Sequence, residues 1–129
     1  SFASTRAAEM ASALVEHIRL AAAEQGHSEA VQHFTVPYIL DHIYYYRVHD
    51  FVEQIALVNL LDDIIADLNS KNTCPIRLIV LDSITFLFRA MDLFRDTSQR
   101  TRILTTMVSQ LNTIAAQHKV AVVLINQGT

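Results

Sequence analysis

Residues 77–83, RLIVLDS, decide the fold, because four consecutive aliphatic residues are followed directly by a carboxylate and a hydroxyl. An uninterrupted aliphatic run of this length is typical of a central strand that is covered on both faces. The run VAVVLI at 120–125 repeats the pattern and ends in the polar pair Asn126 and Gln127. Two such runs with a helical stretch between them predict a parallel sheet with helical crossovers.

Helical periodicity surrounds these strands. We expect helices over about 5–25, 50–69 and 97–119, where apolar residues recur every three or four positions. Asp50 and Glu53 form a capping-box-like pair at the start of the second helix, and Gly26 suits the end of the first. The residues expected to face inward are Met10, Leu14, Ile18 and Ala21 in the first helix, Phe51, Ile55, Val58, Leu61, Ile65 and Leu68 in the second, and Ile103, Met107, Leu111, Ile114 and His118 in the third.

Two shorter segments complete the expected order. Phe34–Asp41 is expected to form a helical turn with Thr35 as its N-cap and Pro37 in its first turn. The tyrosine-rich run Ile43–Val48 is expected to be a third, buried parallel strand. Helices and strands therefore alternate, which predicts the α/β class with a mainly parallel sheet. Because no Pro- or Gly-rich linker interrupts the chain, we expect residues 1–129 to belong to a single domain.

Composition narrows the classes of function. The net charge of −3 argues against a generally cationic nucleic-acid binder but leaves room for a local basic patch. No apolar run approaches the roughly 18 to 20 residues that a membrane-spanning helix needs, so we expect no membrane partner. The single cysteine, Cys74, cannot form an intrachain disulfide, which makes a reducing compartment such as the cytosol or nucleus the default.

Glycine is scarce, with only Gly26 and Gly128 where average usage of about 7% predicts roughly nine. A phosphate-binding loop needs glycines so that backbone N–H groups can approach the anion, and neither common phosphate-loop motif can be written with these two. The chain also starts at Ser1 and ends at Thr129, just after an apolar run. We therefore expect it to be a part of a longer protein that carries the phosphate loop elsewhere.

The strand ends are the candidate site, since ligands of open parallel sheets bind beyond the carboxyl ends of strands. Asp82 after an aliphatic strand matches the pattern of a Walker B carboxylate, which orients hydrated Mg²⁺ at the phosphates of ATP, and Ser83 follows it directly. Gln127 is placed to hydrogen-bond a terminal phosphate or a water. The structural alternative is that Asp82 caps a turn or helix and that Gln127 is one of the polar residues that end most strands.

Four arginines form the only basic concentration in the sequence: Arg89, Arg95, Arg100 and Arg102. Guanidinium groups suit phosphate oxygens, and the start of the helix at about 97 adds N–H groups that favour an anion. This pattern predicts contacts with the DNA backbone. Because Asp92 and Asp96 lie among the arginines, local ion pairing on a solvated surface is the alternative.

Other side chains point to packing. The six histidines have no metal-ligand spacing with one another or with acidic residues, and the sequence around Cys74 does not indicate a catalytic thiol. We interpret Tyr44 to Tyr46 as core or interface residues, with no role in base stacking.

The run RLIVLDSITFLF at 77–88, and the stretch from Thr97 to Gln127, resemble the RecA-type strand-exchange recombinases of eukaryotes. FTVPYILDHIYYYR and the following helix, up to Leu68, resemble one paralogue branch of that family more specifically. The resemblance covers nearly the whole chain. It implies a RecA-like P-loop ATPase core segment from which the Walker A part is absent.

The resemblance also implies roles. Asp82 matches the Walker B aspartate that helps to hold Mg²⁺ with ATP. Gln127 matches a glutamine that senses the γ-phosphate at the start of the second DNA-binding loop. Residues 89–100 match the first DNA-binding loop, and the catalytic glutamate would lie just before Ser1. The longer protein would then be a DNA-dependent ATPase in homologous-recombination repair of double-strand breaks, whereas this chain alone would not hydrolyse ATP.

Its expected partners are single-stranded or branched DNA and other recombinase paralogues, and its expected location is the nucleus, with some in the cytoplasm. Two alternatives remain open. One is a non-catalytic scaffold that uses Tyr44 to Tyr46 and the helices to hold partners. The other is an unrelated flavodoxin-like binding domain in which Asp82 is a turn residue.

Overall fold

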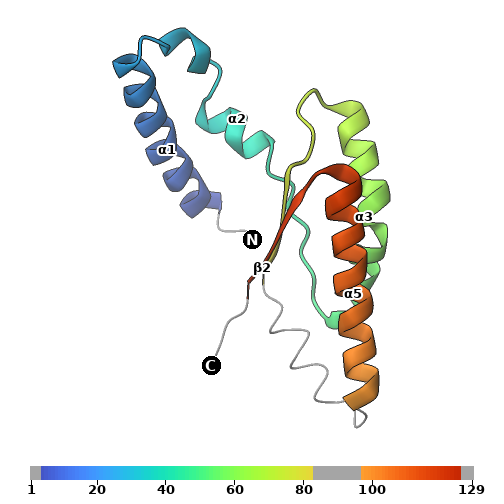
Figure 1. The fold of residues 1–129 in the computed structure, drawn as a ribbon. Coiled ribbons are helices and arrows are strands. Elements are labelled where there is room, and N and C mark those ends of the chain that lie inside the picture. Colours follow the sequence, from blue (N-terminus) through green and yellow to red (C-terminus); the bar gives the residue numbers. More distant parts are fainter. Residues whose placement is uncertain (1–3, 83–96, 126–129) are drawn as a thin grey trace. The chain divides into compact units, whose positions relative to one another are not determined.

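The computed structural model describes residues 4–82 and 97–125. Contacts group the chain into two compact units, 1–47 and 48–129. Within the described residues, helices α1, α2, α3 and α5 and a short 3₁₀ helix accompany a two-stranded sheet (Figure 1). None of these helices is both long and apolar enough to cross a bilayer.

The first unit contains α1 (Ser4–Glu24), the 3₁₀ helix η1 (Ser28–Val31) and α2 (Val36–Asp41). Gly26 adopts a φ of 75°, and the N–H groups of Gly26 and His27 donate to the carbonyls of Ala23 and Ala22, which closes α1 in a Schellman motif. Thr35 caps α2 by accepting a hydrogen bond from the Tyr38 N–H at 3.2 Å. The predicted end of α1 and the predicted start of α2 are both confirmed.

The predicted inward face of α1 is wrong for Met10 and Leu14, whereas Ile18 and Ala21 are half-buried. Ala11 and Val15 are buried, whereas Met10 and Leu14 are 61% and 45% exposed. The apolar residues of α1 cover a wide arc of the helix, so periodicity marks the arc without showing which part of it packs against α2 and η1.

The predicted strand at Ile43–Val48 is also wrong, because the structure has irregular backbone there. Ile43, Tyr45 and Tyr46 are 45%, 52% and 48% exposed. A strand requires a neighbouring strand to complete its backbone hydrogen bonds, and the sheet of the described residues contains only β1 and β2.

The second unit runs α3 (Phe51–Lys71), β1 (Leu78–Asp82), α5 (Thr97–His118) and β2 (Ala121–Ile125). Asp50 caps α3, since its Oδ1 accepts the Glu53 N–H at 2.8 Å. Glu53 reaches back one residue further than in a standard capping box, and accepts the His49 N–H at 2.7 Å. The predicted helix start is therefore confirmed, with a shifted second bond.

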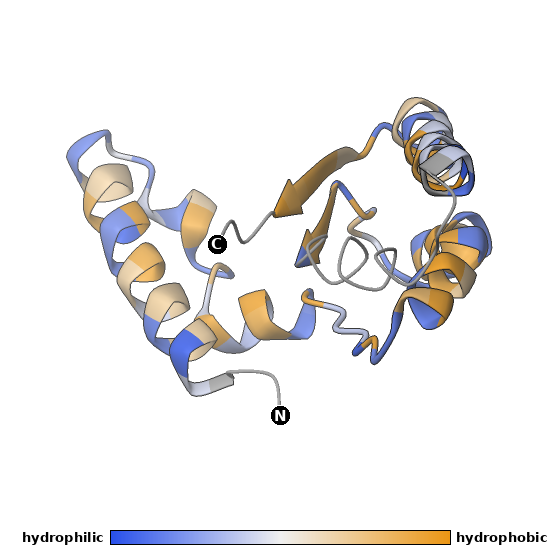
Figure 2. Cartoon of the chain, turned by 90° about the horizontal axis from the view of Figure 1, so that it is seen from below, coloured by the Kyte–Doolittle hydropathy of each residue, from blue (hydrophilic) through white to orange (hydrophobic). Residues whose placement is uncertain are grey.

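β1 and β2 pair in parallel, with Leu78 opposite Ala121 and Asp82 opposite Ile125. Both strands are apolar along most of their length (Figure 2). The predicted parallel sheet with helical crossovers is confirmed for these two strands, and the α/β class with it.

Helices α3 and α5 lie side by side and cover one face of the sheet (Figure 1). The core joins Val58 of α3, Leu81 of β1 and Met107 and Leu111 of α5. The prediction that β1 is covered on both faces is wrong for the described residues, because Leu78 and Val80 are 57% and 49% exposed. Alternating side chains of a strand point to opposite faces, and the two helices reach only one of them.

Candidate nucleotide and DNA site at the strand ends

Asp82 is the last residue of β1 and is exposed, whereas the preceding Leu81 is buried. Because side chains alternate along a strand, the Asp82 carboxylate lies on the face of the sheet opposite the core that Leu81 joins. Its register partner Ile125 is the last residue of β2. The two strands thus end together, and a carboxylate stands at that edge.

The other residues predicted at this edge, Ser83 and Gln127, lie outside the described residues, as does Asn126. In the sequence, Ser83 follows Asp82 directly and Gln127 follows Ile125 by two positions. The register of β1 and β2 therefore starts both continuations from the same edge of the sheet.

A single carboxylate at this edge fits a Mg²⁺ ion that is bound mainly by water and phosphate oxygens. Mg²⁺ keeps several waters and takes one or two carboxylates together with phosphate oxygens. Within 4–82 and 97–125, no group of three or more histidine, cysteine or acidic side chains could hold a metal. Asp82 suits a metal that arrives with a nucleotide and is touched through water.

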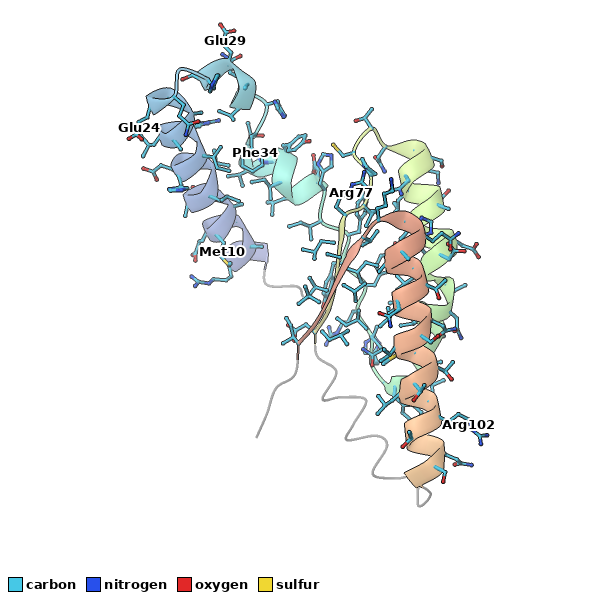
Figure 3. All side chains as sticks on the ribbon, in the orientation of Figure 1. Met10, Glu24, Glu29, Phe34, Arg77 and Arg102 are labelled. Carbon is cyan, nitrogen blue, oxygen red and sulfur yellow. The ribbon has the colours of Figure 1, made fainter. Side chains whose placement is uncertain are left out.

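The predicted arginine site is described only in part. Arg89 and Arg95 lie outside the described residues. Arg100 belongs to the first turn of α5, which contains no acidic residue, and Arg102 is exposed and points away from the helix (Figure 3). The first turn of a helix carries a partial positive charge that attracts an anion, and Arg100 is the predicted site residue that belongs to this turn.

Two features of the second unit were not predicted. The His118 ring, predicted to face inward, contacts the Asp62 carboxylate of α3 at 2.5 Å. Gln54 of α3 is only 7% exposed, although a glutamine next to a glutamate, Glu53, indicates a surface position. Sequence reasoning could not find the His118–Asp62 contact, because the two residues are 56 positions apart. The burial of Gln54 likewise has no signal in the neighbouring sequence.

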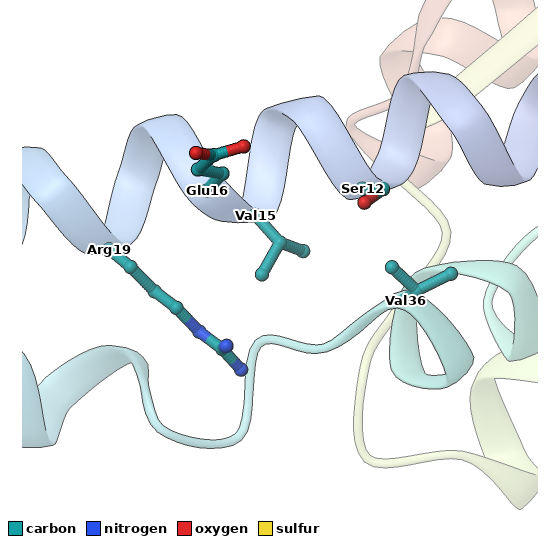
Figure 4. Close-up of a pocket in the computed structure, with 5 residues that line it drawn as sticks. All are labelled: Ser12, Val15, Glu16, Arg19 and Val36. Atoms are coloured by element: carbon teal, nitrogen blue, oxygen red, sulfur yellow. The ribbon is translucent and has the colours of Figure 1, made fainter.

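The hollows of the first unit do not contain any predicted site residue. One lies between α1 and α2 and is lined by Ser12, Val15, Glu16, Arg19 and Val36 (Figure 4). Arg19 also lines a second hollow with Ser28, Val31 and Gln32. Neither hollow contains a residue of the predicted site, so the strand ends remain the candidate site.

The comparisons with known proteins agree with this architecture. The family model Rad51 matches residues 29–129. "DNA repair protein RAD51 homolog 3" of Cricetulus griseus is 38% identical over 132 aligned residues, which cover 100% of this chain and 34% of the relative. The protein of the same name from Dictyostelium discoideum is 36% identical, over 100% of this chain and 32% of its own length.

A third relative, "DNA repair protein XRCC3 homolog" of Arabidopsis thaliana, is 30% identical over 69% of this chain and 29% of its own length. The chain spans about a third of the length of these relatives. Homolog 3 is the family's paralogue C. This is the paralogue branch that residues 34–68 resemble in sequence, so that resemblance is confirmed. The chain belongs to the Rad51 family of RecA-like proteins.

Proposed function

We propose that the chain is part of the ATP-binding core of a recombinase paralogue that acts in homologous-recombination repair of DNA double-strand breaks. The shared end of β1 and β2, with the Asp82 carboxylate on it, is the observation that carries the proposal. The names of the relatives support a role in DNA repair. We take residues 1–129 to be part of one RecA-like domain of the longer protein.

At the strand ends, Asp82 would hold Mg²⁺ through a coordinated water, with Ser83 beside it. Gln127 would hydrogen-bond the terminal phosphate and report its presence to the DNA-binding loop. Bound Mg²⁺ supplies positive charge that offsets the charge of the phosphates. The Walker A lysine and the catalytic glutamate are not among the 129 residues, so this chain alone would not hydrolyse ATP.

DNA would bind through the arginines at positions 89, 95, 100 and 102, which contact phosphates without reading sequence. We propose single-stranded or branched DNA as the nucleic-acid partner, other recombinase paralogues as protein partners, and the nucleus as the main location. ATP would act mainly as a ligand that sets subunit assembly and the state of the DNA-binding loops.

The experiment that tests the nucleotide site uses Asp82→Asn in the full-length protein. The amide keeps the size of the side chain and loses the charge that orients Mg²⁺, so the affinity for ATP in the presence of Mg²⁺ should fall while binding without Mg²⁺ changes little. Asp63→Asn is the matched control, because Asp63 is an exposed carboxylate of α3. Equal Mg²⁺-dependent affinity for all three proteins would refute the site.

The exposed tyrosines favour a second candidate function, a non-catalytic scaffold. Tyr44, Tyr45 and Tyr46 are between 37% and 52% exposed, and tyrosine is enriched at protein interfaces. If the scaffold is the whole function, Asp82→Asn will retain both ATP affinity and DNA repair in cells that lack the native protein. Tyr44→Ala combined with Tyr46→Ala will then abolish repair.

A further inference from the structure

In the described part of the chain, the guanidinium of Arg19 has no hydrogen bond and no ion pair. Arg6 of the same helix, in contrast, pairs with Glu9 at 3.4 Å. Glu16 lies three positions before Arg19, a spacing at which opposite charges on a helix can pair. Figure 4 shows that the two side chains diverge instead, and that Arg19 extends from α1 toward the chain between η1 and α2. The guanidinium is therefore available to an anion from outside the chain.

Arg19 lines both hollows of the first unit. One hollow, of about 310 Å³, lies between α1 and α2, where Val15 and Val36 form an apolar wall (Figure 4). The other has a volume of about 320 Å³, and its remaining lining residues are Ser28, Val31 and Gln32. Both volumes are at the lower end of the range for small-molecule sites, so each hollow suits a single side chain of a ligand.

The two hollows offer different chemistry. In the second, the Arg19 guanidinium, the Ser28 hydroxyl and the Gln32 amide can all donate hydrogen bonds, and none of the lining residues is acidic. A guanidinium holds a carboxylate by two parallel hydrogen bonds. In the first hollow, Val15 is only 6% exposed and faces Val36 across an aliphatic surface. A ligand that fills both hollows therefore carries a carboxylate close to an apolar group.

The charge of the first unit decides which class of anion fits. Residues 1–47 contain three arginines and no lysine, but five acidic residues: Glu9, Glu16, Glu24, Glu29 and Asp41. This excess of negative charge repels a polyanion such as a nucleic acid. Phosphorylated peptides are recognised by clusters of arginines, whereas one arginine lines these hollows. A single carboxylate of a peptide matches the one available guanidinium.

We propose that the two hollows bind an extended peptide segment of a partner protein, with an acidic side chain on Arg19 and an apolar side chain against Val15 and Val36. Side chains two positions apart in an extended segment lie on the same face, so they can enter two neighbouring hollows. Ser28 and Gln32 donate further hydrogen bonds to the carboxylate. This site lies within the first unit and does not depend on nucleotide binding at the strand ends.

Methyl NMR of the full-length protein tests the proposal, with the capped peptide alanine-leucine-alanine-glutamate-alanine as the probe. The methyl signals of Val15 and Val36 should shift as the peptide is added. Replacing its glutamate with glutamine should weaken binding by about tenfold or more, because the charged hydrogen bonds to Arg19 are lost. Arg19→Gln should weaken binding of the glutamate peptide by a similar factor. Arg6→Gln is the matched control, since it removes a cation of α1 that lines neither hollow.

Three results overturn the proposal. The first is unchanged methyl signals of Val15 and Val36 at millimolar peptide. The second is equal affinity for the glutamate and glutamine peptides, or an equal loss in Arg19→Gln and Arg6→Gln. The third is sodium acetate that binds as tightly as the glutamate peptide, because the apolar hollow then contributes nothing. The comparison of the two peptides uses the native protein, so it decides the question even if Arg19→Gln fails to fold.

Discussion

Asp82 and Ile125 lie opposite each other in the parallel register, as the last residues of β1 and β2. The pairing makes the two strands end together, and in the sequence Ser83 and Asn126 follow them directly. An open parallel sheet offers its ligand site at this edge. A register shifted by two residues would have left the Asp82 carboxylate beside a strand interior, where a bound nucleotide has no room.

The arginines predict how DNA binding depends on salt. Arg95→Ala combined with Arg100→Ala in the full-length protein should weaken binding to single-stranded DNA of every sequence. Binding by the variant should release fewer counterions, because two phosphate contacts are lost. At about 0.7 per contact with single-stranded DNA, the slope of log K against log salt should become shallower by about 1.4. Titration of labelled oligonucleotides at several salt concentrations measures this slope.

Arg19→Ala serves as a control, since Arg19 lines the hollows of the first unit and is not one of the predicted DNA-binding arginines. It removes a positive charge and should leave the slope unchanged. If the double variant has the same slope as the native protein, these two arginines do not contact phosphates.

The cap of α3 predicts a loss of stability. Asp50→Ala removes the acceptor of the Glu53 N–H and should cost about 1 kcal/mol, whereas Asp50→Asn, an equally good N-cap, should cost much less. Thermal unfolding of the full-length protein compares the three forms. Equal midpoints for the alanine and asparagine variants would mean that the side-chain bond contributes nothing.

Lys119 predicts a gain in stability. Its φ of 55° is left-handed, and the Val120 N–H donates to the Ala115 carbonyl, so Lys119 is the C′ residue of a Schellman motif at the end of α5. A side chain is strained in this conformation and glycine is not, so Lys119→Gly should raise stability by up to about 1 kcal/mol. Lys119→Val, which is branched at Cβ, should lower it. A lower midpoint for the glycine variant than for the native protein would show that the Lys119 side chain contributes more than its backbone strain costs.

What the sequence could predict depended on how local the interaction is. The caps at Thr35 and Asp50 and the end of α1 at Gly26 follow from neighbouring residues, and all three are confirmed. The strands β1 and β2 were also predicted, because an aliphatic run buried in a parallel sheet has a simple pattern. Asp82 at a strand end follows directly from that pattern.

Longer-range interactions could not be predicted from periodicity. Whether Ile43–Val48 pairs as a strand depends on a partner elsewhere in the protein, and Met10 and Leu14 satisfy helical spacing as well as Ala11 and Val15 do. The contact of His118 with Asp62 joins residues 56 positions apart. At the candidate site, the roles of all the predicted residues stay predictions, and Ser83, Gln127, Arg89 and Arg95 also lie outside the described residues.

The central claim is that Asp82 and Gln127 act on the same bound nucleotide, and a double-mutant cycle tests it most directly. The affinity for ATP with Mg²⁺ is measured for the full-length protein, for Asp82→Asn, for Gln127→Ala and for the double variant. Groups that share one ligand are coupled, so the two effects should fail to add by about 0.5–3 kcal/mol. Effects that add to within about 0.5 kcal/mol, or single variants that bind as well as the native protein, would contradict the claim.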